Sequence, residues 1–270
     1  MSNILVRTIW GALFVAIVLS SFIIGGYVAA LVLALFMSLG LLEFYRFFDN
    51  IEDINPIKSI GLIGALVLFF GMTCSTLLDF NLNLLFIPVI FSPFLLIVFS
   101  KSKNPILDVS ILLFSWAYLL LPFYFMFEIY AFDHGEDFQW IYIVGFFLMV
   151  WANDTFAYLS GRFFGKNKLF ERISPKKTWE GAIGGFIFTL LFGFGYATVI
   201  DGNSLFWIVS AILISPTSIF GDLIESRLKR IVNVKDSGTI LPGHGGILDR
   251  FDAAMYASPF FYFLLLLFFS

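Results

Sequence analysis

Long apolar stretches alternate with short polar segments along almost the whole chain. A helix needs about 20 apolar residues to cross the ~30 Å hydrocarbon core of a bilayer. By that measure the pattern predicts about nine transmembrane helices. Their expected ranges are 8–24, 27–47, 59–78, 82–99, 107–130, 138–161, 181–199, 204–225 and 252–269, with a Gly25–Gly26 turn between the first two. The predicted fold class is an all-α polytopic membrane protein.

The basic residues test this count, because they collect on one side of a membrane. When the connections are numbered alternately from the N-terminus, all 16 Lys and Arg residues fall on the same side. The charged residues of the other side are all acidic: Asp79, Glu128, Asp133, Glu136, Asp137 and Asp201. The positive-inside rule makes the basic side cytoplasmic. We therefore expect a cytoplasmic N-terminus and a polar site that faces the cytoplasm.

Composition supports the membrane assignment. The chain is 60% hydrophobic and 13% charged, and a soluble domain carries about twice that charge. Cys74 is the single cysteine and lies in an apolar run, which argues against a disulfide or a thiol metal site. No small-residue cleavage motif follows the first apolar stretch, so we expect a retained helix rather than a signal peptide.

The two halves of the chain differ in their polar content. We expect an N-terminal transmembrane region at 1–137, with short polar loops, and a C-terminal catalytic region at 138–270, with two large basic loops and acidic residues near the membrane. Gly181 and Gly185 have the spacing of small residues at helix–helix contacts, which favours a packing role.

Asp154 is the first acidic residue within a predicted span of the second half. It lies eight residues before Arg162, or about 12 Å inside the membrane at 1.5 Å per residue. A carboxylate at such depth costs about 2.5–3.5 kcal/mol on insertion scales, so it needs a polar cavity or a partner. Either a substrate site or a structural ion pair would satisfy it.

The loop before the seventh span combines hydroxyl groups with positive charge. Ser174 and Pro175 precede Lys176 and Lys177. We expect Pro175 in the first helical turn after a Ser174 cap, with backbone N–H groups that suit a phosphate. An orientation signal or a contact with anionic headgroups would explain the same lysines.

The eighth predicted span carries Asp222 near its end. If the helix continues outward, Asp222, Ser226 and Lys229 or Arg230 follow one face at steps of about four residues. Pro216 can kink this span and expose backbone carbonyl groups to a cavity. Ion pairing at the helix end is the alternative interpretation.

The most polar segment follows, and its candidate residues are Lys235, Asp236, Gly243, His244, Gly245, Gly246, Asp249, Arg250 and Asp252. The glycines let the backbone approach a ligand closely. Asp249 and Asp252 are one helical turn apart, and carboxylates near phosphates are a common way to hold Mg²⁺. Lys and Arg would neutralise the remaining phosphate charge. A lone His244 is more often a hydrogen-bonding residue than a base.

The same residues carry a family resemblance. The segment Ser226-x-x-Lys229-Arg230-x4-Lys235-Asp236-x-Gly238-x2-Leu241-Pro242-x-His244-Gly245-Gly246-x2-Asp249-Arg250-x-Asp252 resembles the CDP-diacylglycerol synthase (phosphatidate cytidylyltransferase) family without a departure. The Asn153–Asp154 pair and the Ile173–Gly181 segment resemble it too. The similarity is strong over residues 145–260 and weak before them.

The resemblance implies an integral enzyme of the bacterial inner membrane, acting as a homodimer, that converts CTP and phosphatidate to CDP-diacylglycerol and diphosphate. It implies Mg²⁺, with K⁺ as a candidate second ion, and no nucleic acid among its partners. Asp222 and Asp249 match the expected metal ligands, with Asp252 or Asp236 in support. Lys176, Lys177, Lys229, Arg230 and Lys235 would bind phosphates, and His244 with its glycines would shape the nucleotide pocket.

Two other classes fit parts of the pattern. Another Mg²⁺-dependent membrane phosphotransferase, such as a polyprenyl-phosphate sugar transferase or a lipid kinase, would need the same acidic residues. A transporter would also place charges in its spans. Against a transporter, the acidic residues collect near one face and no inverted repeat is visible.

Overall fold

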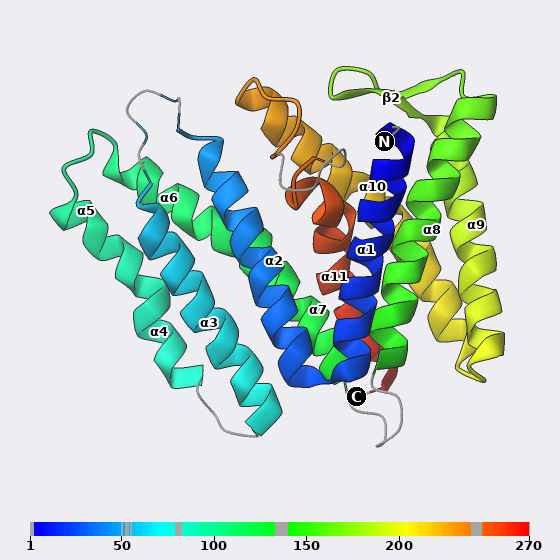
Figure 1. The fold of residues 1–270 in the computed structure, drawn as a ribbon, viewed down its shortest axis with the longest axis horizontal. Helices are drawn as coiled ribbons and strands as arrows, with labels where there is room; N and C mark the ends of the chain where they lie inside the picture. Colours follow the sequence, from blue (N-terminus) through cyan, green and yellow to red (C-terminus); the bar gives the residue numbers. More distant parts are fainter. Residues whose placement is uncertain are drawn as a thin grey trace. The chain divides into compact units, whose positions relative to one another are not determined.

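The computed structural model describes residues 3–49, 51, 54, 56–78, 83–132, 140–238 and 245–269. Within these ranges the regular secondary structure is helical apart from one short hairpin (Figure 1). Two compact units divide it. Unit 1 comprises Met1–Ala131 and Val232–Arg250, and unit 2 comprises Phe132–Ile231 and Phe251–Ser270. The segment 232–250 therefore belongs with the N-terminal helices, although it follows a helix of unit 2 along the chain.

Unit 1 is built from helices α1 to α7 and two short connecting turns. Their bounds are α1 Asn3–Ile24, α2 Gly26–Arg46, α3 Lys58–Leu78, α4 Asn83–Phe91, η1 Ser92–Phe94, α5 Leu95–Phe99, α6 Pro105–Ser115, η2 Trp116–Leu120 and α7 Leu121–Ala131. Gly25 separates α1 from α2 with a φ of 143°, a value that side chains strongly disfavour. The predicted turn between the first two helices is confirmed.

A few polar side chains form hydrogen bonds between helices inside the apolar core of unit 1. The hydroxyl groups of Tyr45 on α2 and Ser115 on α6 share a hydrogen bond of 2.6 Å. The indole N–H of Trp116 donates to the carbonyl group of Gly61 on α3 at 2.8 Å. These residues lie among fully buried rings and aliphatic chains. Because a buried polar group without a partner is costly, such bonds also fix how the helices pack.

The turn η2 is a π-helical widening between α6 and α7. Pro122 lies two residues after its end, in the first turn of α7. Proline lacks the N–H group that would bond to the residue four positions earlier, and its ring collides with that carbonyl group. The wider turn accommodates the proline, so α6, η2 and α7 continue as one apolar rod from Pro105 to Ala131.

Unit 2 consists of three long helices, the hairpin and a fourth long helix from Phe251 onward, whose first three residues belong to unit 1. Their bounds are α8 Trp140–Phe164, β1 Lys168–Phe170, β2 Ser174–Thr178, α9 Trp179–Val199, α10 Ser204–Ile231 and α11 Leu248–Phe269. Strands β1 and β2 pair antiparallel. In the core, the phenol group of Tyr196 donates to the carbonyl group of Ile141 at 2.8 Å, and Trp207 is 1% exposed.

The start of α9 corrects one sequence prediction. Pro175 does not lie in a helical turn capped by Ser174, because both residues belong to strand β2. Thr178 is the N-cap, and its hydroxyl oxygen accepts a hydrogen bond from the N–H of Gly181 at 3.2 Å. Pairing with β1 keeps the Ser–Pro segment extended, and Pro disfavours a helical conformation of the residue before it.

Helices α8 and α9 lie side by side along their lengths (Figure 1). Gly181 and Gly185 are buried in this contact. A Cβ atom at Gly185 would stand 2.9 Å from the carbonyl oxygen of Asn153, and one at Gly181 would stand 2.7 Å from that of Ala157. The predicted packing role of the two glycines is confirmed.

Seven of the described helices are long and apolar enough to cross a membrane. They are α2, α3, the rod α6–η2–α7, α8, α9, α10 and α11, and two shorter apolar helices cover Thr8–Ile24 and Phe86–Phe99. Many large apolar side chains point outward from them, among them Val98, Phe163 and Leu267, as lipid contact requires. The all-α polytopic fold is confirmed, while the number of crossings and their orientation stay predictions.

A methyl group at Gly185 tests the α8–α9 contact. We expect Gly185→Ala to lower the stability of the protein by about 1–3 kcal/mol, because the helices would have to separate. Gly195→Ala on the same helix is the matched control, since nothing lies within 4 Å of its Cβ position. Thermal unfolding in detergent measures both variants. Equal melting temperatures would contradict this packing.

Candidate functional site

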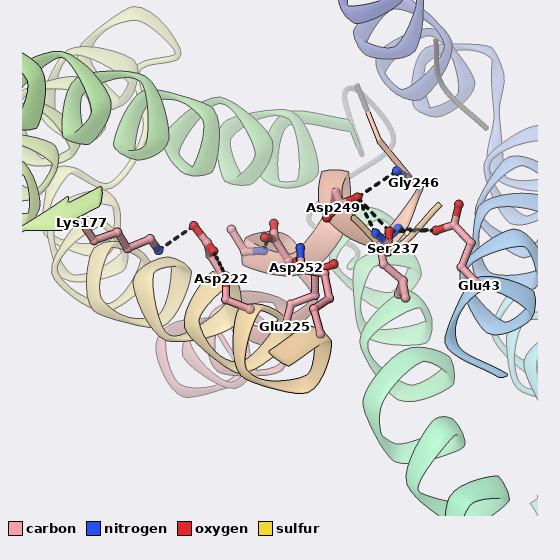
Figure 2. A network of polar contacts seen from close by, with 12 residues as sticks. Glu43, Lys177, Asp222, Glu225, Ser237, Gly246, Asp249 and Asp252 are labelled. Carbon is pink, nitrogen blue, oxygen red and sulfur yellow. Dashed lines mark hydrogen bonds and ion pairs between the residues drawn. The ribbon is translucent and has the colours of Figure 1, made fainter. Parts of the chain in front are cut away.

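Polar side chains gather at helix ends in each unit, and Figure 2 shows both groups. In unit 2, Asp222 of α10 is the centre of one group. Its Oδ2 lies 2.6 Å from the Nζ of Lys177 on β2, and its Oδ1 accepts from the hydroxyl group of Ser226 at 3.1 Å. Lys177 also donates to the carbonyl group of Ile219 at 3.4 Å. The hairpin thus delivers a lysine to a carboxylate of α10.

Asp252 of α11 is associated with the same group. Gly221, directly before Asp222, brings α10 close to α11, since its Cβ position is 3.0 Å from the Cα of Ala253. Asp252 lies within the electrostatic reach of Asp222, Glu225 and Asp154. Three further carboxylates of unit 2 therefore act electrostatically on Asp252.

Asp154 and Asn153 are neighbours on α8 with different surroundings. Asp154 is exposed, whereas Asn153 is 1% exposed and its Oδ1 accepts from the hydroxyl group of Ser215 on α10 at 2.7 Å. Asn153 therefore joins α8 to α10 inside the unit. Asp154 is the member of the pair that a ligand can reach.

Glu225 is a residue of this group that the sequence analysis did not select. Its Oε2 lies 2.5 Å from the Nζ of Lys229, one helical turn further along α10. The exposed fractions of the two side chains are 1% and 11%. The four-residue spacing of opposite charges is a signal that could have found the pair. Lys229 is thus largely buried in an ion pair, although we expected it to bind phosphate.

In unit 1, Asp249 in the first turn of α11 is held by backbone and hydroxyl donors. Its Oδ2 accepts from the N–H of Ser237 at 3.1 Å, the hydroxyl group of Ser237 at 2.9 Å and the N–H of Gly246 at 2.9 Å. Gly245 has a φ of 82°, which turns the chain toward this carboxylate. The glycine-rich backbone, expected to approach a ligand, here approaches Asp249.

Glu43 on α2 is the second carboxylate of unit 1 at this position, and the sequence analysis did not select it either. Its Oε2 accepts from the N–H of Leu248 at 3.0 Å and lies 3.3 Å from the hydroxyl oxygen of Ser237 (Figure 2). It is 0% exposed. A glutamate within an apolar span is itself an indication of function.

The remaining candidates lie mostly at the surface. Ser174 is partly exposed, and the exposed ones are Lys176, Arg230, Lys235, Asp236 and Arg250. Gly243 and His244 lie outside the described residues. The exposed cations come from the two basic loops in both units, where phosphate groups in solution can reach them.

The donor chemistry fits a hard divalent cation. Carboxylate oxygens are what Mg²⁺ prefers, and it commonly uses one or two of them while waters and substrate phosphates complete its shell. Within the described ranges, no three His, Cys, Asp or Glu side chains lie together in a way that could hold a metal ion. The Mg²⁺ ligands expected from the sequence therefore stay a prediction.

Comparison with known proteins identifies the family of the chain. The model of the cytidylyltransferase family matches residues 5–268. The chain belongs to the cytidylyltransferase family. A phosphatidate cytidylyltransferase of Staphylococcus haemolyticus is 36% identical over 97% of this chain and 98% of its own length. One from Staphylococcus epidermidis is 35% identical over the same shares. One from Staphylococcus aureus is 43% identical over 63% of this chain and 64% of its own. The family that the sequence resembled is confirmed.

Loss of Lys229 tests its role in this family member. We expect Lys229→Met to cost about 3–5 kcal/mol of stability, because it removes the ammonium group that neutralises the buried Glu225. The double variant Glu225→Gln/Lys229→Met should recover much of the loss. Arg230→Ala, at the exposed neighbour, should stay within about 0.5 kcal/mol. Denaturant unfolding in detergent provides the comparison, and a Lys229→Met protein as stable as Arg230→Ala would refute the structural role.

Proposed function

We propose that this chain is a phosphatidate cytidylyltransferase, which transfers the cytidylyl group of CTP to phosphatidate and releases diphosphate. One observation carries the proposal: family similarity extends over residues 5–268, and relatives with this name match nearly the full chain. The carboxylates and basic loops found in the structure supply the chemistry that two anionic substrates need.

The reaction requires alignment and charge neutralisation more than proton transfer. A phosphate oxygen of phosphatidate attacks the α-phosphorus of CTP, and the bond from that phosphorus to the oxygen bridging to the β-phosphorus breaks. The nucleophile is already an anion, so it needs no strong base. Holding the two phosphates in line, in a site of fixed charges, supplies most of the catalysis in such a transfer.

The basic residues would hold the phosphate groups. Lys177 is the best placed. Its ammonium group contacts the carboxylate group of Asp222 on α10, and its side chain is still 23% exposed. The exposed candidates for the outer phosphates are Lys176, Arg230, Lys235 and Arg250. We assign Lys229 to its ion pair with Glu225 instead, since burial removes it from solution.

Asp222 and Asp249 are the proposed Mg²⁺ ligands, with Asp252 as a further candidate. Asp222 and Asp252 belong to unit 2, and Asp249 belongs to unit 1. Hydrogen bonds orient the carboxylate groups of Asp222 and Asp249. A bound Mg²⁺ would supply positive charge to the triphosphate and to the diphosphate that leaves. A second ion such as K⁺ belongs to the same proposal. Asp236 stays a predicted supporting residue of the metal site, and the predicted substrate contacts are Asp154, Ser174, Ser226, Gly243 and His244.

The membrane setting follows from the substrates. CTP is soluble in water and phosphatidate is anchored in lipid, so the reaction belongs at the bilayer surface. We propose the cytoplasmic face of the bacterial inner membrane, because the basic loops gather on one predicted side. We also propose the homodimer that the family resemblance implies. Light scattering in detergent measures that state, and a monomeric active enzyme would contradict it.

Turnover tests the proposed reaction. We expect the purified protein to form CDP-diacylglycerol and diphosphate from CTP and phosphatidate in the presence of Mg²⁺. Asp249→Asn and Asp222→Asn should each lower kcat by about a hundredfold or more, a loss of roughly 2.7 kcal/mol in transition-state stabilisation. Chelation of Mg²⁺ by EDTA should abolish turnover of the wild-type protein.

Asp201→Asn is the matched control, because Asp201 is exposed and its φ of 51° suits asparagine as well. All variants should melt at the wild-type temperature within a few degrees. A normal rate in folded Asp249→Asn and Asp222→Asn would remove these residues from the metal site. Wild-type protein that releases no diphosphate would end the proposal.

Labelling from the two sides of the membrane tests the orientation. In a Cys74→Ser background, a cysteine introduced at exposed Arg172 should react with an impermeant maleimide only from the cytoplasmic side. One introduced at exposed Asp201 should react only from the opposite side. Intact spheroplasts expose the outer face to the reagent, and inverted vesicles expose the cytoplasmic face. The reverse labelling pattern would overturn the assignment.

A further inference from the structure

Glu43 is a buried carboxylate in a transmembrane helix that the proposed reaction has not used. It lies in α2, is 0% exposed and is more than 190 residues away in the chain from the groups that it contacts. A charged group without contact to water is expensive to bury unless it is paired. Its contacts therefore indicate what the chain gains from keeping it.

One contact is with the beginning of α11. The N–H of Leu248 donates to the Oε2 of Glu43 at 3.0 Å, and Leu248 is the first residue of that helix. The first N–H groups of a helix have no partner inside it. An acceptor usually comes from a neighbouring cap residue. Here it comes from a distant helix of the same unit, so Glu43 ties the start of α11 to α2.

The second contact is with Ser237. Its hydroxyl oxygen lies 3.3 Å from the Oε2 of Glu43 and 2.9 Å from the Oδ2 of Asp249. A hydroxyl group has one proton to donate, so it serves one carboxylate at a time, and the shorter distance favours Asp249. Ser237 is 6% exposed. Glu43 and Asp249 together therefore hold its side chain in place.

The backbone encloses the Glu43 carboxylate closely. A Cβ atom at Gly238 would stand 2.8 Å from the Cδ of Glu43, and one at Gly246 would stand 2.7 Å from it. Two glycines, one on each side of residues 239–244, therefore rest against one buried carboxylate. The Glu43 side chain fits this backbone at both ends of the segment and at the start of α11.

We propose that Glu43 is a positioning residue for Asp249. It fixes Ser237, Gly246 and Leu248, and the first two of these donate all three bonds that orient the Oδ2 of Asp249. The inference rests on the proposed function, in which Asp249 is a ligand of Mg²⁺. Partners behind a metal ligand typically change metal affinity or activity by about 10–100-fold when they are removed.

The test compares Glu43→Ala and Glu43→Gln with Asp108→Asn in the full chain, purified in detergent. Asp108 is a buried acid of the same unit, 4% exposed, on α6, so it controls for the loss of a buried charge. Glu43→Gln keeps the side-chain volume and an oxygen that can accept from Leu248, and it carries the test if Glu43→Ala does not fold.

Two readouts are needed. Hydrogen exchange of peptides containing Ser237, Gly246 and Leu248 should speed up by about tenfold or more in Glu43→Ala, less in Glu43→Gln, and not in Asp108→Asn. The Mg²⁺ concentration for half-maximal turnover should rise by about tenfold or more in Glu43→Ala, with the KM for phosphatidate changed far less. Glu43→Gln should again be intermediate.

The outcomes separate this inference from the proposed function. Unchanged exchange in these peptides would show that Glu43 does not hold them and would overturn the inference. Faster exchange with wild-type Mg²⁺ dependence would make Glu43 a structural cap and would overturn it too. If the wild-type protein forms no CDP-diacylglycerol, the proposed function fails, and the exchange data still decide whether Glu43 holds the Asp249 segment.

Discussion

A carboxylate group buried in a lipid-soluble chain needs a hydrogen-bond donor or an opposite charge, and this requirement shapes the polar parts of the molecule. Asp249 takes three hydrogen bonds from Ser237 and Gly246, and Glu43 accepts one from the start of α11. In unit 2, ammonium groups of Lys177 and Lys229 meet Asp222 and Glu225. Each acid is therefore held in a defined place, which is the condition for using it in catalysis.

The same constraint explains where apolar and charged residues lie along the helices. Their middle turns are mostly apolar and pack through glycines and aromatic rings, as at Gly185 against the backbone of Asn153 and at Gly145 against Trp207. Their ends carry the charge, because there polar groups can reach water and headgroups. A reaction between a soluble nucleotide and a lipid phosphate needs that boundary. The hairpin β1–β2 extends the polar surface and delivers Lys177 to α10.

Much of this could be predicted from the sequence, for identifiable reasons. Long apolar stretches located the helices, since the length and hydropathy of a segment decide whether it can span a membrane. The polar motif at 226–252 identified the family. Glu43 was missed because its partner Leu248 is more than 200 residues away in the chain and becomes visible only once the fold is known. Glu225 was missed although its four-residue spacing from Lys229 is a signal in the sequence. Pro175 was misassigned because pairing between β1 and β2 is a contact that local preference does not encode. The place of residues 232–250 in unit 1 is likewise a tertiary property.

The most direct test follows two phosphorus atoms of CTP. CTP labelled with phosphorus-32 at either the α- or the γ-phosphate is incubated with the purified protein, Mg²⁺ and phosphatidate, and lipid is then extracted. The account predicts that α-label enters the lipid fraction in proportion to turnover, while γ-label stays in the aqueous phase as diphosphate. Transfer of γ-label into lipid would show a lipid kinase, and neither label in lipid would show that no cytidylyl transfer occurs. Either result would contradict the account.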